Sequence, residues 1–182
     1  GFAYPEFNVG TSTPAFGVVS VSLSNVFAFS PSGLNKVYMW GLMRGAVAPL
    51  VSRNFGASFE PFGVGGTFKR TMALAVGGSD DRLGVAKMDY GVLLSDDGGQ
   101  SWRAYHHANT PPPWPDGTGD YRTRTAWGVA LSPAANDKTV VALVGDPASI
   151  VRSSDFGSSW ELVSSNDSVE SKKTRIFWHR QS

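Results

Sequence analysis

The chain has 182 residues and no cysteine, with 21 glycines, 11 prolines and 12% aromatic residues. This composition favours one all-β domain, or part of one, and excludes a disulfide scaffold, thiolate zinc sites and a cysteine nucleophile. The formal net charge of +1 makes nucleic acid an unexpected partner, and no apolar run reaches the roughly 18 residues of a membrane span, so no membrane insertion is expected.

Short strand patterns divide the chain into three similar units. The first unit is predicted over residues 18–62, the second over 71–105 and the third over 126–163. Each contains four short apolar or alternating runs that are separated by glycine, proline, asparagine or serine, as is typical of antiparallel sheets. Residues 174–182 are predicted to begin a further unit of the same kind.

Before its last strand, each unit contains the same turn motif, which reads SRNFGASF at 52–59, SDDGGQSW at 95–102 and SSDFGSSW at 153–160. The acid or amide at the third position can accept hydrogen bonds from backbone amides, and the glycine can adopt positive φ. The final aromatic ring can then cover the turn. We therefore predict a structural role for the motif residues: Ser52, Asn54, Gly56, Phe59, Ser95, Asp97, Gly99, Trp102, Ser153, Asp155, Gly157 and Trp160.

The motif resembles the Asp-box, also called the bacterial neuraminidase repeat (BNR). This repeat occurs in sialidases, in xyloglucan-active glycoside hydrolases of family 74 and in sortilin-type receptors. The resemblance implies a β-propeller whose blades have four antiparallel strands, with the box between the third and fourth strands. It implies less about activity, because enzymes and non-enzymes share the box.

The segment GTST at residues 10–13, together with the three boxes, is most similar to the xyloglucan-active hydrolases. Those enzymes contain two propellers, and the substrate cleft between them receives one catalytic aspartate from each. The Gly-Asp that begins an innermost strand in that family has no counterpart here, because the corresponding stretch is Trp127-Gly128-Val129. The kinship therefore does not carry the catalytic residues over.

Three blades do not close a propeller, which typically has four to eight. We expect this chain to be part of a larger protein with one six- to ten-bladed propeller or with two propellers. The remaining blades would come from the same or another chain, since open blade flanks would favour aggregation.

The connection between the second and third strands of a blade lies at the end opposite the Asp-box, as does the link to the next blade. Functional residues of propellers usually lie at that end. A hydrolase there would need two carboxylates about 5 to 10 Å apart. The candidate catalytic acids are Asp89, Asp116, Asp120 and Asp146. The candidate substrate-binding residues are Arg44, Tyr90, Trp114, Tyr121 and Arg122.

A long link between the second and third units, residues 106–125, contains Trp114 and Tyr121. Loops of this length are often functional, and the two aromatic rings offer flat faces on which a sugar could stack. The alternative is that Trp114 only anchors the loop to the blade below it.

These observations predict a segment of a secreted, carbohydrate-active propeller that binds a polysaccharide or oligosaccharide, without a cofactor or a metal. If the protein is an enzyme, the resemblance implies a glycoside hydrolase of the endo-glucanase or xyloglucanase type. The alternative is a non-catalytic propeller, similar to sortilin, that binds a protein ligand or acts as a scaffold.

Overall fold

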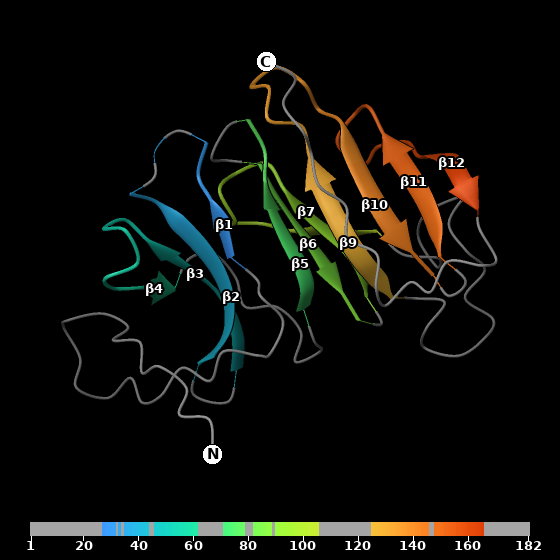
Figure 1. The fold of residues 1–182 in the computed structure, drawn as a ribbon. Helices are drawn as coiled ribbons and strands as arrows, with labels where there is room; N and C mark the ends of the chain where they lie inside the picture. Colours follow the sequence, from blue (N-terminus) through green and yellow to red (C-terminus); the bar gives the residue numbers. More distant parts are fainter. Residues whose placement is uncertain are drawn as a thin grey trace.

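The computed structural model describes most of the three predicted units and their turns. The described residues are 27–31, 33, 35–43, 46–61, 71–78, 82–88, 90–105, 125–145 and 148–165. They contain β-strands and turns and no helix. The strands form three antiparallel sheets of four strands each, which we call blades 1, 2 and 3 (Figure 1).

Each blade is a meander in which consecutive strands are neighbours. Blade 1 contains β1 (Phe27–Phe29), β2 (Val37–Met43), β3 (Ala46–Ser52) and β4 (Glu60–Pro61). Blade 2 contains β5 (Thr71–Val76), β6 (Leu83–Lys87), β7 (Gly91–Ser95) and β8 (Arg103–Tyr105). Blade 3 contains β9 (Ala126–Leu131), β10 (Val140–Val144), β11 (Ser149–Ser153) and β12 (Glu161–Ser165).

The three blades stand side by side in chain order, blue, green and orange in Figure 1. The first strand of each blade lies next to the first strand of its neighbour, because β5 contacts β1 on one side and β9 on the other. The predicted fold class is confirmed: the chain is all-β and contains about three four-stranded blades of a β-propeller.

Strands β6 and β7 are buried along their whole length. They are apolar on both faces, unlike a strand with one face in water, because one face packs on blade 1 and the other on blade 3. Strand β9, with the sequence AWGVAL, also has no exposed position, and its face with Val129 and Leu131 packs against blade 2. Burial of both faces therefore follows from the stacking of blades.

The interface between blades 2 and 3 is a continuous apolar core. Its buried members are Ala86, Val92, Leu94, Ala126, Val129, Leu131, Val140, Ala142, Val144, Val151 and Phe156. The β5–β6 turn also contacts the β9–β10 turn through the main chain, because the Gly78 amide donates a hydrogen bond of 2.9 Å to the Ser132 carbonyl. A Cβ on Gly78 would lie 2.2 Å from the Ala134 carbonyl carbon, so the contact requires glycine.

The interface between blades 1 and 2 is made of larger, more aromatic side chains. Tyr38 and Val51 of blade 1 pack on Leu83 of blade 2. Trp40 meets the Trp102 ring edge to face, with centroids 5.4 Å apart and an interplanar angle of 80°. The two interfaces therefore differ in composition although the blades share one topology.

Candidate functional site

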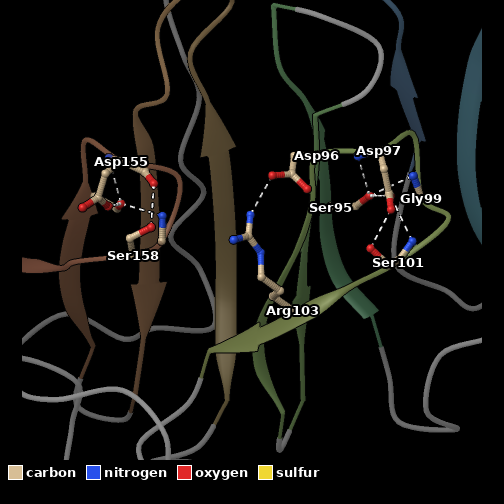
Figure 2. Close-up of polar contacts among 10 residues, drawn as sticks. Ser95, Asp96, Asp97, Gly99, Ser101, Arg103, Asp155 and Ser158 are labelled. Carbon is tan, nitrogen blue, oxygen red and sulfur yellow. Dashed lines mark hydrogen bonds and ion pairs between the residues drawn. The ribbon is translucent and has the colours of Figure 1, made fainter.

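In blade 2 the repeat turn, residues 95–102, is held by hydrogen bonds between neighbouring residues (Figure 2). The Ser95 hydroxyl donates to Asp97 Oδ1 at 2.8 Å and accepts a hydrogen bond from the Gly99 amide at 2.8 Å. Asp97 Oδ1 also accepts from the Ser101 amide at 2.9 Å, and Oδ2 accepts from the Ser101 hydroxyl at 2.5 Å. Both carboxylate oxygens are thus used inside the turn.

The repeat turn of blade 3, residues 153–160, has the same geometry. Ser153 donates to Asp155 Oδ1 at 2.8 Å and accepts from the Gly157 amide at 2.7 Å. Asp155 accepts from the amide and hydroxyl of Ser159 at 2.8 and 2.6 Å. The two turns therefore share one pattern of side-chain hydrogen bonds.

These donors stabilise the charged carboxylates. The pKa of Asp97 is lowered to about 2, first by the hydroxyl of Ser101 and then by its amide. The pKa of Asp155 is lowered as well, chiefly by the Ser159 hydroxyl. A general acid near neutral pH needs a raised pKa, so neither aspartate suits that role.

In blade 1, residues 52–59, an amide replaces the carboxylate. Asn54 Oδ1 accepts hydrogen bonds from the Ser52 hydroxyl and the Ser58 amide, both at 2.9 Å. Its Nδ2 donates to the Ser58 hydroxyl at 2.8 Å, which reverses the direction of the corresponding bond in blades 2 and 3. An asparagine therefore holds the same turn without a charge.

All three turns contain two successive residues with positive φ. The second is always glycine, with φ of 86° at Gly56, 89° at Gly99 and 91° at Gly157. Glycine has no Cβ that would clash in this left-handed region, which explains its recurrence at this position.

At the opposite end of blade 2, the last residue of β6 is a buried lysine. Lys87 Nζ lies 3.3 Å from Thr71 Oγ1 and 4.9 Å from the centroid of the Trp40 ring of blade 1. Burial disfavours the charged ammonium and lowers the pKa of Lys87 from 10.5 to about 8.

The sequence analysis missed Lys87, although the repeat contains a signal for it. When the blades are aligned on their turn serines through the strand register, Lys87 corresponds to Gly41 of blade 1 and Val144 of blade 3. The other two blades have glycine or valine at this position, so the lysine could have been recognised from the aligned repeats as an unusual residue at this end of the interface.

Of the predicted site residues, the structure describes Tyr90, which lies in the β6–β7 connection near Lys87 and is 37% exposed. The other candidates lie outside the described residues: Arg44, Asp89, Trp114, Asp116, Asp120, Tyr121, Arg122 and Asp146. Strand β8 runs away from the repeat turn to Tyr105, and β9 begins at Ala126. The link between these two strands therefore starts and ends at the same end of the blades as Tyr90.

Within the described ranges, no group of three or more histidine, aspartate or glutamate side chains is placed to hold a metal ion. No helix in this part of the chain is long and apolar enough to cross a membrane.

No protein-family model and no curated protein matches the sequence. Solved structures match the fold. An ancestral GH74 enzyme matches with a TM-score of 0.57 and 22% identity over 82% of this chain and 19% of its own. The GH74 enzyme of Niastella koreensis matches with a TM-score of 0.56 and 19% identity over 79% of this chain and 23% of its own. YCF48 bound to D1 peptide matches with a TM-score of 0.54 and 14% identity over 87% of this chain and 45% of its own.

The chain therefore spans less than half the length of each of these solved proteins. At such low identities the likeness is one of fold. The similar structures include propellers named as GH74 enzymes and a propeller bound to a peptide.

Proposed function

We propose that this chain is a sector of a secreted, Asp-box propeller that binds a polysaccharide at the end opposite its repeat turns. The observation that carries the proposal is the use of Asp97 and Asp155 inside their own turns, where serine donors occupy their oxygens. Recognition chemistry is then left to the other end of the blades. That end carries the half-exposed Tyr90 and both ends of the link 106–124.

An extended glycan fits such a surface because each sugar ring offers an apolar face and a rim of hydroxyls. The ring of Tyr90 supplies a flat apolar surface and a phenolic hydroxyl that can bond to a sugar. Trp114 and Tyr121 would add stacking surfaces, and Arg44 and Arg122 would donate hydrogen bonds. This division between aromatic and charged groups is the chemistry expected of a binding cleft.

Catalysis would require acidic residues at the same surface in addition to the glycan-binding residues. Two of the acids Asp89, Asp116, Asp120 and Asp146 would have to face the glycan about 5 to 10 Å apart. The likeness in fold to the two GH74 enzymes supports a hydrolase of this type, acting together with further blades.

The test is a panel of soluble polysaccharides, including xyloglucan, measured by isothermal calorimetry and by release of reducing ends. Binding should fall at least about tenfold in Trp114→Ala and by a smaller factor in Tyr90→Ala. The matched control is Phe55→Ala, which removes an exposed aromatic ring from the repeat-turn end and should leave binding unchanged. Absence of any glycan binding, or an equal loss in the control, would refute the proposal.

A second function is supported by the likeness to YCF48 bound to D1 peptide. In that case the same end would bind a peptide, and no sugar product would form. A peptide array probed with the 182-residue chain separates the two functions, because Tyr90→Ala and Trp114→Ala would then reduce peptide binding and not glycan binding. A secreted location is tested by fractionating cells that produce the protein.

A further inference from the structure

Lys87 is a costly residue at a place where the other blades do without a charge. It is fully buried between blades 1 and 2, and this burial disfavours its ammonium group and lowers its pKa to about 8. The equivalent residues of the other two blades are Gly41 and Val144. Stacking of the blades therefore does not require a lysine here. A residue that lowers stability and is not needed for packing indicates a functional constraint.

Three neighbours hold the Lys87 side chain in one place. The residue ends β6 and pairs with Thr71 of β5 on one side and with Gly91 of β7 on the other. Gly91 has no side chain that would compete for the space beside the lysine stem. From there Nζ lies 3.3 Å from Thr71 Oγ1 and 4.9 Å from the centroid of the Trp40 ring of blade 1. The side chain thus connects β6 both to the first strand of its own blade and to the preceding blade.

Lys87 is also the residue from which the connection with Tyr90 starts. The strand pairing closes at Lys87 and Gly91, so the connection consists of residues 88–90 alone. Gly91 has φ of 70°, which is typical of a tight hairpin connection. Tyr90, which is 37% exposed, is therefore joined to the end of β6 by a very short segment. A shift of Lys87 relative to blade 1 must shift Tyr90 as well.

We propose that Lys87 is a positioning residue: its ammonium, held against the Trp40 ring, fixes the β6–β7 connection relative to blade 1 and so orients Tyr90 for ligand binding. This inference rests on the proposed function, in which Tyr90 contacts the ligand. It adds that the binding surface is aligned by a contact between two blades. A cation is attracted to the face of an aromatic ring, so the contact has a preferred geometry that an apolar side chain of similar length lacks.

The first test needs no ligand. The 182-residue chain is labelled on its tyrosine rings for NMR, and Tyr90→Phe assigns the Tyr90 signal. Lys87→Met should shift or broaden that signal, because the connection loses its attachment to blade 1. The matched control is the signal of Tyr38, which lies at the repeat-turn end of the same interface and should stay in place. An unchanged Tyr90 signal in a folded Lys87→Met variant, or equal changes at both tyrosines, would overturn the proposal.

The role of Trp40 is tested with Trp40→Phe, which keeps a ring beside Lys87 but weakens the attraction to the ammonium. Lys87→Met should then displace the Tyr90 signal less than it does in the wild-type background, because the two residues act through one contact. Melting curves check that both variants are folded. Equal displacement in the two backgrounds would show that Trp40 does not hold the ammonium in the way proposed.

The second test compares stability with binding and uses soluble xyloglucan as the probe. Lys87→Met should melt at a higher temperature than the wild type at pH 7 and yet bind xyloglucan about threefold or more weakly. In the Tyr90→Ala background the same substitution should have no further effect on binding. Weaker binding together with lower stability would mean that Lys87 acts only through the fold, and unchanged binding would mean that it does not position Tyr90 for recognition.

The two tests separate this inference from the proposed function. If the wild-type chain binds no xyloglucan, the proposed function fails for this glycan, and the NMR comparison alone decides whether Lys87 positions Tyr90.

Discussion

The two interfaces between blades differ in the residues that they bury, although the blades share one topology. Between blades 2 and 3 the buried residues form one continuous cluster, and Val144 lies in it at the end opposite the repeat turns. Between blades 1 and 2 the matching position is Lys87, and the apolar contacts are divided into smaller clusters around Trp40 and Tyr38. The same topology thus accepts either an aliphatic residue or a buried ammonium.

The difference identifies the interface between blades 1 and 2 as the more polar one. Burying a charge is costly, and the Trp40 ring and the Thr71 hydroxyl offset part of this cost for Lys87, with about 0.5 to 2 kcal/mol from the cation–π contact. The indole Nε1 of Trp40 is buried and has no acceptor among the described residues.

The largest expected effect comes from breaking the apolar interface. Phe156→Ala should lower the free energy of unfolding by about 3 to 5 kcal/mol, because it removes a buried ring and leaves a cavity against Leu94. The matched control Phe55→Ala removes the same ring from the same turn where it is exposed, and should change stability by less than about 0.5 kcal/mol. Urea unfolding followed by tryptophan fluorescence measures both. Equal losses would mean that the two rings do not differ in burial as the structure describes.

A smaller effect should follow when the polar interface is made like the apolar one by Lys87→Met. The folded-state pKa of Lys87 is about 8 and its ordinary value is 10.5, so between these pH values the unfolded chain binds more protons. The wild-type free energy of unfolding should therefore rise with pH across this range, by up to about 1.4 kcal/mol per pH unit. Lys87→Met should be more stable than the wild type at pH 7, and this rise should be absent.

The pH test is the difference between the two unfolding profiles, which cancels the titration of all other groups. Profiles that stay parallel from pH 7 to 10 would show that Lys87 keeps its ordinary pKa. Lys87→Arg serves as a control, because it keeps the charge and should not reproduce the stabilisation.

The smallest effect is expected from Asp97→Asn, which makes the turn of blade 2 like that of blade 1. Asn54 shows that an amide holds the turn, with one hydrogen bond reversed. The lowered pKa of Asp97 contributes stability that is present above about pH 4 and is lost as the pH falls toward 2. The variant should therefore be slightly less stable at neutral pH and should lose less on acidification. Thermal melts at pH 2.5 and 7 check this, and an equal acid sensitivity of both proteins would contradict it.

The fold was predictable from the sequence because its signal is repeated. Ser, Asp or Asn, Gly and an aromatic residue recur at one spacing, and each has a local physical role that does not depend on the rest of the chain. The pairing of β7 with β8 follows from the same turn, which joins Ser95 to Arg103.

The candidate site was less predictable. Lys87 is unusual because of Trp40, which lies 47 positions earlier in the sequence and reaches it only through blade stacking. Tyr90 was predicted because it belongs to a short connection whose place is fixed by topology. The acids and aromatic residues of the longer links are not placed by strand pairing or by a short turn. The distances between their side chains therefore do not follow from the sequence.

The hydrogen bonds that the serine and aspartate side chains make within the repeat turns join residues two to four positions apart. Contacts this short in sequence carry little loop-closure entropy, so the bends can form within microseconds, before any two sheets meet. Each bend then holds the third and fourth strands of its sheet in register while the slower contacts between blades develop. The repeated motif thus influences which contacts form first during folding as well as the final structure. A substitution that destabilises one of these turns should slow refolding more than it accelerates unfolding.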